Sequence, residues 1–536
     1  MINKKLLTLD CTFRDGGYYN NWNFDINLFN QYINCMNLCK IDFVEIGFRF
    51  IKIDKFIGPF GYTTEKFLSS LELPRSIKYS VMINAKEYIN NEDKIFEVFS
   101  KKNKSKISLV RIAINFDDYK SGKILTENLK KLGYSVGFNL MQAHDKNSNK
   151  CKVLTQEISS WKTVDYLYFA DSLGCMKPND INKLIINLKK NWKGNLGIHA
   201  HNNKNLALIN TTTAINSGID ICDSTILGMG RGAGNTETEN LMIEIKKIKN
   251  HIQAENISKV SKLFKILKSQ YDWGSNFLYN YSADMKIHPT YVQNLLQENR
   301  YTEKEVFLIL QNLSKLNVTS FSSSKINDYF YFNQKELKQN NNLKIPIIKK
   351  FKNSKALILG NGNSLKTSSF IIKKTLNKKN LLKLFLNTNL HFSNNQADFT
   401  IIVNTMRILF EENKFSYIKS KIIAPVKSYK KVFRKSKNLN NALNYDVCIQ
   451  SNVFKIYDNF CILPSPIALA YAIAILIQSG INNIYLAGID GYHSNKRLHN
   501  ELVLLLKSVN SNYPNVNIYS LTPTLLKIKL VKNNEI

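Results

Sequence analysis

Several residue types and segments are scarce in this 536-residue chain. It has only 10 prolines and 22 glycines, which excludes a collagen-like chain. Its 8 cysteines are dispersed and form no CxxC pair, so the sequence predicts neither a disulfide scaffold nor a structural zinc site. The longest apolar run, Ile467 to Ile477, is about half of what a bilayer requires. It predicts a buried helix, and we expect no membrane span and no signal peptide.

Acidic residues are also scarce, since 74 Lys and Arg against 41 Asp and Glu give a formal net charge of +33. Such a charge suggests nucleic-acid or membrane binding. The basic runs are short and scattered, as at Lys101 to Lys104, and no stacking-aromatic motif accompanies them. We therefore interpret the charge as a lysine-rich solvated surface and expect no nucleic-acid partner. Reduced thiols are the cytoplasmic default, and we expect a cytoplasmic protein.

The remaining composition, with 44% hydrophobic and 21% charged residues, is typical of a globular protein of two or three domains. The first 250 residues alternate strand-like and helix-like segments. Eight short apolar runs are strand candidates: Leu6–Asp10, Phe43–Gly47, Tyr79–Ile83, Leu109–Ile114, Ser135–Leu140, Tyr166–Ala170, Leu196–His199 and Ile219–Thr225. Runs of this kind suit parallel strands covered on both faces. They predict a (β/α)8 barrel over residues 1–250, with an open doubly wound sheet as the alternative.

Polar side chains favour the barrel, because they follow nearly every strand candidate, and barrels place their active sites at the carboxyl ends of the strands. The strand ends and nearby positions carry Arg14, Asp15, Glu45, Arg111, Asn139, Gln142, Asp171, Ser172, His199, His201 and Asn235. We predict that Glu45, Arg111, Asn139, Gln142, Asp171 and Ser172 bind substrate.

His199 and His201 are two residues apart at a strand end, so both imidazoles point the same way. An HxH pair proves little by itself, but two imidazoles and a carboxylate make a good site for a divalent metal. Barrel closure brings Asp15 to the same end, and Asn235 could add a fourth oxygen ligand. Mixed nitrogen and oxygen ligands leave Mn²⁺, Mg²⁺, Co²⁺ and Zn²⁺ possible, with Mn²⁺ or Mg²⁺ favoured.

A metal in this place would hold a 2-oxo acid through its keto and carboxylate oxygens and act as a Lewis acid on a developing enolate. Arg14, next to Asp15, can direct its guanidinium to the same oxygen. The glycine-rich segment 228–234 lets the backbone approach a ligand closely.

Three motifs together resemble the HMG-CoA lyase-like metal-dependent barrels: Leu9-Asp10-Cys11-Thr12-Phe13-Arg14-Asp15-Gly16-Gly17, the His199/His201 pair, and the glycine-rich loop that ends at Asn235. Residues 138–142 and 171–174 are most similar to the 4-hydroxy-2-oxovalerate aldolase branch, and the resemblance covers about residues 1–300. It implies Asp15, His199 and His201 as metal ligands, with Arg14 stabilising the enolate beside which a carbon–carbon bond is made or broken.

The chain departs from this branch in one position. Those aldolases carry a histidine base a few residues after the metal aspartate, and the matching stretch here holds Tyr18 and Tyr19. A tyrosine near its normal pKa of about 10 is a poor base at neutral pH. We expect Tyr18 to donate a hydrogen bond to the aldehyde oxygen, and we name His288 as the candidate for a substitute base.

Beyond the barrel, we predict a helical extension over residues 251–316, which in the aldolases covers the barrel mouth and docks a dehydrogenase. A linker is expected over 317–354 and a small Rossmann-like domain over 355–536. This last domain opens with a strand and the small-residue turn Gly360 to Leu365, which favours phosphate. Asp490 ends a later strand, where open α/β sheets bind ligands.

The turn at 360–365 and the strand that ends at Asp490 resemble bacterial sialyltransferases and MptE-like pterin diphosphokinase domains. In the sialyltransferases the asparagine and serine of this turn contact the CMP donor, which implies nucleotide contacts for Asn361 and Ser364. No catalytic histidine is assigned, since neither His391 nor His493 lies in a motif. The fusion suggests a role in surface-glycan biosynthesis.

The leading hypothesis is a metal-dependent aldolase that acts on a pyruvate-type 2-oxo acid and an aldehyde, as a homo-oligomer. One alternative is a Claisen-type transferase that condenses an acyl-CoA, which usually needs a glutamate base and CoA contacts. Another is a bifunctional protein whose C-terminal domain is a CMP-sugar- or nucleotide-dependent transferase. A non-catalytic scaffold is disfavoured, because Arg14, Asp15, His199 and His201 are all intact.

Overall fold

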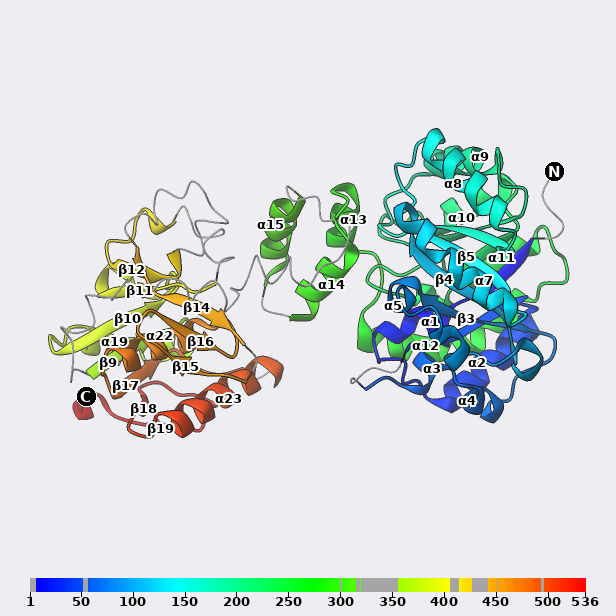
Figure 1. Cartoon of the computed structure of the whole chain (residues 1–536). Coiled ribbons are helices and arrows are strands. Elements are labelled where there is room, and N and C mark those ends of the chain that lie inside the picture. Colours follow the sequence, from blue (N-terminus) through cyan, green and yellow to red (C-terminus); the bar gives the residue numbers. More distant parts are fainter. Residues whose placement is uncertain are drawn as a thin grey trace. The chain divides into compact units, whose positions relative to one another are not determined.

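A computed structural model gives the fold of the chain (Figure 1). It describes residues 6–51, 56–298, 301–314, 319, 355–404, 414–426, 442–450, 452–492 and 496–536. The chain divides into two compact units, Met1–Phe321 and Ser322–Ile536. Most of the linker predicted over 317–354 lies outside the described residues, as does His493.

Eight parallel strands close into a barrel in the first unit, in sequence order. They are β1 (Leu7–Asp10), β2 (Phe43–Phe48), β3 (Lys78–Asn84), β4 (Ile107–Asn115), β5 (Ser135–Met141), β6 (Tyr166–Asp171), β7 (Asn195–Ala200) and β8 (Ile221–Ser224). Strand β1 pairs with both β2 and β8, which closes the barrel. The predicted (β/α)8 fold is confirmed, and the open sheet is excluded.

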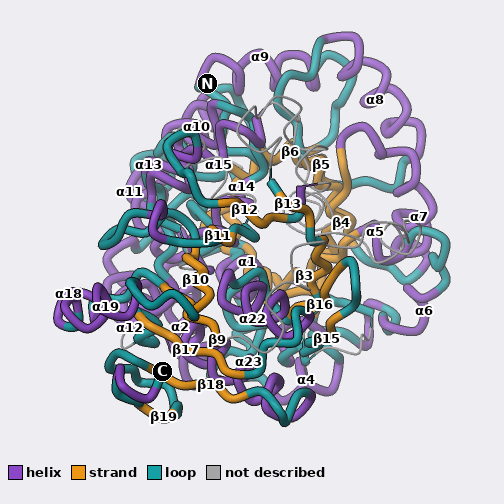
Figure 2. The backbone as a smooth tube through the Cα atoms, turned by 90° about the vertical axis from the view of Figure 1, so that its left-hand side faces the viewer, coloured by secondary structure: helices purple, strands orange, loops and turns teal. Residues whose placement is uncertain are grey.

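Helices surround the barrel, and Figure 2 shows α7, α8 and α9 outside strands β4 to β6. The longer ones are α2 (Ile26–Cys39), α7 (Lys123–Lys131), α8 (Ser148–Trp161), α9 (Pro178–Lys189), α10 (Ala207–Asn216), α11 (Thr238–Lys246) and α12 (Ile257–Tyr271). Their sequences explain their placement. In α8, for example, Cys151, Leu154, Ile158 and Trp161 are buried at helical spacing, so one apolar face packs on the strands.

The barrel interior is layered. One layer is an apolar cluster of inward-facing side chains: Leu9, Cys11, Phe43, Leu109, Tyr168 and Ile221. Because alternate residues of a strand share a face, the next inward positions on β2, β4 and β8 are Glu45, Arg111 and Asp223. These charged residues therefore form a layer of their own toward the carboxyl ends of the strands.

Three further helices, α13 (Phe277–Asp284), α14 (Pro289–Glu298) and α15 (Glu303–Ser314), follow α12 in the first unit. The segment that leads into α13 is fastened to the loops after β7 and β8. Trp273 Nε1 donates to the Leu227 carbonyl (2.9 Å), and Ser275 Oγ donates to the Asn203 carbonyl (2.8 Å).

Two ion pairs fasten the end of α13 to loops at the carboxyl ends of the strands: Lys204 with Asp284, and Lys286 with Asp145. The helical extension is thus attached to the loops after β5, β7 and β8.

The second unit contains one eight-stranded parallel sheet in the order β13-β12-β11-β10-β9-β17-β18-β19. Its strands are β9 (Lys355–Leu359), β10 (Leu381–Leu386), β11 (Phe399–Ile401), β12 (Lys421–Ala424), β13 (Leu443–Asn444), β17 (Asn483–Ala487), β18 (Asn517–Ser520) and β19 (Lys529–Leu530). The order reverses between β9 and β17, so the loops after these two strands flank a switch point, where open α/β sheets bind ligands.

A small three-stranded sheet, formed by β14 (Asp446–Ile449), β15 (Lys455–Ile456) and β16 (Phe460–Leu463), accompanies the large one. The apolar run that begins at Ile467 forms α22 (Ala468–Gln478), which is buried along most of its length, as predicted. The other main helices of this unit are α19 (Ser369–Leu376) and α23 (Lys496–Asn512). Within the described residues, no helix combines the length and apolarity that a bilayer crossing needs.

Candidate active site

The turn α1 (Thr12–Asp15), which follows β1, is held in place by the buried carboxylate of Asp10. That carboxylate accepts hydrogen bonds from Thr12 N (2.9 Å), Thr12 Oγ1 (2.6 Å), Tyr32 Oη (2.6 Å) and Thr238 Oγ1 (2.6 Å). These bonds connect β1 and α2, which begin the barrel in the sequence, with α11, which comes after its last strand. Elements that are far apart in the sequence therefore fix the orientation of α1.

Glu45 lies at the centre of the charged layer, fully buried. Its carboxylate accepts from Arg14 Nε (2.8 Å) and from Arg111 Nε and Nη2 (2.7 and 2.6 Å). Arg111 is also fully buried, and its Nη1 donates to Asp223 Oδ2 (2.7 Å). One carboxylate therefore serves two guanidinium groups. That Glu45 and Arg111 contact the substrate directly stays a prediction. In the structure, Glu45 holds Arg14 and Arg111 holds Asp223.

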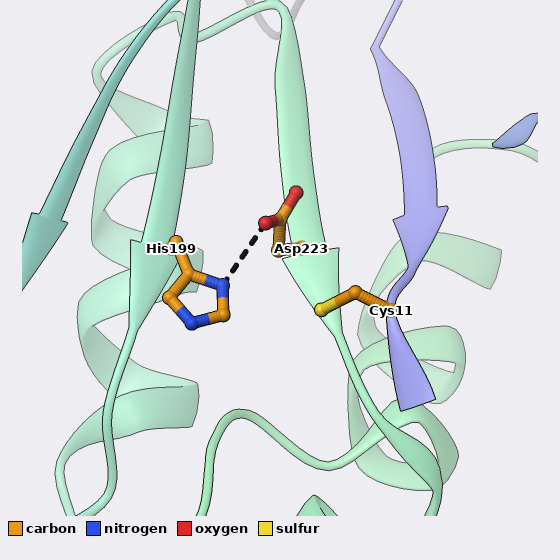
Figure 3. A group of neighbouring side chains, drawn as sticks. All are labelled: Cys11, His199 and Asp223. Atoms are coloured by element: carbon orange, nitrogen blue, oxygen red, sulfur yellow. Dashed lines mark hydrogen bonds and ion pairs between the residues drawn. The ribbon is translucent and has the colours of Figure 1, made fainter. Parts of the chain in front are cut away.

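The remaining contacts close the layer into a ring of alternating charge. His199 Nδ1 lies 2.9 Å from Asp223 Oδ2 (Figure 3), and His199 Nε2 lies 3.6 Å from Asp15 Oδ2. Asp15 Oδ1 accepts from Arg14 Nη1 (2.7 Å), which leads back to Glu45. We call these six residues (Arg14, Asp15, Glu45, Arg111, His199 and Asp223) the charge ring.

The charge ring controls the ionisation of its members. Burial alone would raise the pKa of Asp15, but Arg14 and His199 together hold that pKa well below its usual range. Burial opposes a charge on His199, whereas the carboxylates of Asp15 and Asp223 raise its pKa well above the ordinary value. Asp15 therefore remains an anion despite complete burial, as a metal-binding carboxylate must.

His201 and Asn235 adjoin Asp15 and have unused ligand atoms. Burial, followed by the charge of His199, lowers the pKa of His201 to about 3, so its imidazole is neutral. His201 Nδ1 and Asn235 Oδ1 are both buried without a hydrogen-bond partner among the described residues. Asn235 Nδ2 donates to Asp15 Oδ2 (2.5 Å). The backbones of Asn235 and His201 also pair in an isolated antiparallel β-bridge.

The donor set of Asp15, His199, His201 and Asn235, which we call the inner set, fits a divalent cation. It offers an ionised carboxylate, the neutral His201 imidazole, an amide oxygen whose lone pairs are unused, and the His199 imidazole, which would release its proton to bind the ion. The backbone of the loop after β8 also lies close to the inner set, because a Cβ atom added to Gly230 would be only 3.0 Å from Asp15 Oδ2. Asp223, bound to His199 Nδ1, orients this ring as carboxylates commonly orient metal-binding histidines.

A second group, Cys11, His199 and Asp223, also has ligand atoms within 4.8 Å of one another (Figure 3). It suits a divalent cation less well. Burial raises the pKa of the Cys11 thiol to about 11, and the thiol lies 3.5 Å from the Ser224 carbonyl, as a donor would.

The other predicted substrate residues lie at the ends of β5 and β6. Asn139 is buried, and its Oδ1 has no partner among the described residues, so it can bind a ligand. Ser172 Oγ instead accepts from Gln142 N (2.9 Å), and Gln142 Nε2 donates to the Thr319 carbonyl (3.0 Å). The Asp171 carboxylate accepts from two backbone amides of its own loop, both at 3.1 Å.

Tyr18 and His288 lie near Arg231. The Arg231 guanidinium carbon lies 3.9 Å from the centre of the Tyr18 ring. His288 comes directly before α14, and Thr290 N lies 3.3 Å from its Nδ1. Burial and then the Arg231 charge lower the pKa of His288 to about 3, so it binds a proton weakly at neutral pH. Its role as the base stays a prediction.

Sequence reasoning did not single out Asp10 or Asp223. A signal existed for Asp223, since it is an isolated carboxylate within an otherwise apolar and small-residue strand, two positions after inward-facing Ile221. Asp10 was visible only as part of the first motif, and its partners Tyr32 and Thr238 come from distant segments.

In the second unit, the three residues predicted to bind a nucleotide lie at the switch point. Asp490 Oδ2 accepts from Ser364 N (2.8 Å), and Asp490 Oδ1 also bonds to the Ser364 hydroxyl. A side chain on Gly362 would collide with this carboxylate. Asn361 Nδ2 donates to the Thr388 carbonyl (3.1 Å), and its Oδ1 accepts from Leu390 N (2.9 Å), so the loops after β9 and β10 are joined.

The fold and the site define the class of the first unit as a (β/α)8 barrel with a buried charged site at the carboxyl ends of its strands. Comparison with known proteins agrees, since residues 98–264 match the HMGL-like family model. Oxaloacetate decarboxylase from Mycobacterium tuberculosis is 24% identical over 257 residues, which cover 47% of this chain and 74% of that protein. The barrel of this chain therefore contains an HMGL-like domain, and it is similar to proteins named as an aldolase and as a decarboxylase.

Other relatives match shorter parts. The 4-hydroxy-2-oxovalerate aldolase of Pelotomaculum thermopropionicum is 37% identical over 118 residues, which cover 22% of this chain and only 34% of that protein. Among solved structures, the N-terminal domain of a candidate aldolase from Bacteroides vulgatus is 31% identical, with a TM-score of 0.49, and covers 54% of this chain and 96% of that one. The carboxyl transferase domain of Rhizobium etli pyruvate carboxylase with pyruvate shares the fold. It is 13% identical with a TM-score of 0.50, and the match covers 60% of this chain and 59% of that one.

Glu45→Gln tests the charge ring, because it leaves Arg14 and Arg111 buried without their shared carboxylate. We expect the free energy of unfolding to fall by about 3–5 kcal/mol. All four tryptophans lie in the first unit, so tryptophan fluorescence during urea unfolding reports on the barrel alone. Glu127→Gln, which removes an exposed pair with Lys123, is the control and should cost about 0–1 kcal/mol. Equal effects of the two substitutions would contradict this account.

Proposed function

We propose that the first unit is a metal-dependent aldolase that forms or cleaves a 2-oxo acid through a pyruvate-type enolate. The observation that carries the proposal is the inner set, with an ionised Asp15 and unused ligand atoms on His201 and Asn235. Two reactions named for the relatives support it, because both aldol cleavage of a 4-hydroxy-2-oxo acid and decarboxylation of oxaloacetate release pyruvate through its enolate.

The inner set would hold a Mn²⁺ or Mg²⁺ ion, which when bound supplies Lewis-acid polarisation of the substrate keto group. Arg14 is the donor for developing negative charge. Its Nε and Nη1 are taken by Glu45 and Asp15, and its Nη2 has no partner among the described residues. Because two of its nitrogens are fixed, Arg14 needs no reorganisation to donate to an enolate oxygen.

Two further residues complete the proposed site. Asn139 Oδ1, buried and unpaired among the described residues, can accept from a hydroxyl of the substrate. Tyr18 is half-buried beside Arg231, where we propose that it donates a hydrogen bond to the aldehyde oxygen. His288 remains the candidate base of this proposal, and the family's usual histidine position holds tyrosine.

Exchange of the pyruvate methyl protons for deuterium, followed by NMR, tests enolate formation without knowledge of the aldehyde. We expect exchange in the presence of Mn²⁺ or Mg²⁺, with a loss of about 100-fold or more in EDTA and in Asp15→Asn. Asp118→Asn removes an exposed carboxylate on the same barrel and should exchange like the unmodified protein.

If a chain that binds metal gives no exchange with pyruvate alone or with added aldehydes, the proposal of a pyruvate enolate is wrong. Acyl-CoA substrates then become the leading alternative.

For the second unit, we propose a nucleotide or CMP-sugar site at the switch point between β9 and β17, which would place the protein in surface-glycan biosynthesis. The observation that favours it is the turn at 360–364, which lies against Asp490 at the carboxyl ends of two neighbouring strands. Ser364 begins the helix α18 (Ser364–Thr367), and its hydroxyl, which bonds to Asp490 in this structure, would turn from that carboxylate to contact a phosphate or ribose.

Titration of the full chain with CMP and with ATP, by calorimetry, tests this second site. Ser364→Ala should weaken binding of the nucleotide that binds by about tenfold, because a hydrogen bond to a charged group is lost. Thr367→Ala changes an exposed hydroxyl one turn later and serves as the control. Absence of binding by both nucleotides, or equal binding by the two variants, would contradict the proposal.

A further inference from the structure

Arg231 stands apart from the other arginines at the carboxyl ends of the barrel strands. Arg14 and Arg111 each have two carboxylates within 2.8 Å. Arg231 has none among the described residues. Its side chain instead contacts the Tyr18 ring, whose centre is 3.9 Å from the guanidinium carbon, and Thr290 Oγ1, which is 3.4 Å from Nη1. Neither contact is with a carboxylate, so the charge of Arg231 has no protein counter-ion within the part of the chain that the structure describes.

The backbone places Arg231 between the inner set and the helical extension. On one side, a Cβ atom on Gly230 would lie 3.0 Å from Asp15 Oδ2. On the other side, Gly232 has a positive φ of +61°, and a Cβ atom there would lie 2.8 Å from the Tyr279 ring in α13. The backbone at Arg231 therefore runs between Asp15 and α13.

The position of Arg231 is also farther out than that of the inner set. Asp15 and Asn235 are each 2% exposed, whereas Arg231 is only half-buried and meets Thr290 in the first turn of α14. A ligand held at the inner set and extending toward α14 would therefore pass this guanidinium.

A half-buried guanidinium without a carboxylate is a ready site for an anion, since it offers planar paired donors that match a carboxylate or a phosphate. The Tyr18 ring lies against one face of the Arg231 guanidinium in a cation–π contact. This contact leaves the N–H groups at the edge of the guanidinium available to an anion. Tyr18 and His288, which lie beside Arg231, carry no carboxylate.

We propose that Arg231 selects substrates by binding an anionic group, a carboxylate or a phosphate, at the end of the substrate remote from its 2-oxo acid. This inference rests on the proposed 2-oxo acid chemistry of the inner set. It deepens that proposal, because it assigns the aldehyde half of the substrate a negative charge. A neutral short aldehyde would leave Arg231 unpaired.

Two matched pairs of probes separate the two sources of anion. In the presence of Mg²⁺, 2-oxoglutarate and 2-oxovalerate have the same chain length and differ in a terminal carboxylate. The second pair, 2-keto-3-deoxygluconate 6-phosphate and 2-keto-3-deoxygluconate, differs in a terminal phosphate. Calorimetry on the full chain measures binding of each compound without any need for turnover.

We expect at least one charged compound to bind about tenfold more tightly than its neutral partner, and Arg231→Gln to abolish that ratio. Arg231→Lys should retain part of the preference, because it keeps the charge and loses the paired donors. Arg75→Gln removes an exposed arginine just before β3, at the opposite end of the barrel, and should retain the full ratio. Tryptophan fluorescence melting curves confirm that each variant is folded.

A ratio near one in the unmodified chain for both pairs, or a ratio that survives in Arg231→Gln, would overturn the inference. Its failure is distinguishable from that of the proposed function. An Arg231-dependent ratio in a chain that does not exchange pyruvate protons would support the anion site and contradict the enolate. Exchange of pyruvate protons in a chain that binds the charged and neutral compounds equally would support the enolate and contradict the anion site.

Discussion

The candidate active site depends on one constraint, which is that the buried carboxylate of Glu45 serves both Arg14 and Arg111. Neither guanidinium could remain in the barrel interior uncompensated, because the cost of an unpaired buried charge is several kcal/mol. Their pairing fixes Arg14 beside Asp15 on one side and Asp223 beside His199 on the other. The geometry of the inner set thus depends on Glu45 and Arg111, which hold Arg14 and Asp223 in place without needing to touch a ligand themselves.

Much of the barrel could be predicted from the sequence, since eight apolar runs with polar residues at their ends are typical of parallel strands covered on both faces. Proximity of Asp15, His199 and Asn235 followed from barrel closure. The pairing of Asp223 with Arg111 and His199 did not, because it depends on which side chains of β4, β7 and β8 share a layer. In the second unit, the strand order and the Ser364–Asp490 contact likewise required the structure.

The predicted helical extension acquires a specific relation to the site only in three dimensions. Local sequence indicates helices near residues 277–298, but nothing in it shows that Thr290 meets Arg231 or that Trp273 binds the loop after β8. In the sequence, Arg231 is one residue of a glycine-rich loop. In the structure, those glycines permit the loop backbone to pass closely between Asp15 and α13, and the Arg231 side chain contacts Tyr18 and Thr290.

His199 belongs to two possible ligand groups: its Nε2 lies toward Asp15, and it also forms a group with Cys11 and with Asp223, which lies beside its Nδ1. Titration with Mn²⁺, followed by electron paramagnetic resonance, distinguishes them most directly. The account predicts one tight ion per chain, a loss of affinity of about 100-fold or more in Asp15→Asn and His201→Asn, and near-normal affinity in Cys11→Ser. Normal binding by His201→Asn together with lost binding by Cys11→Ser would place the ion beside Cys11 and contradict the account.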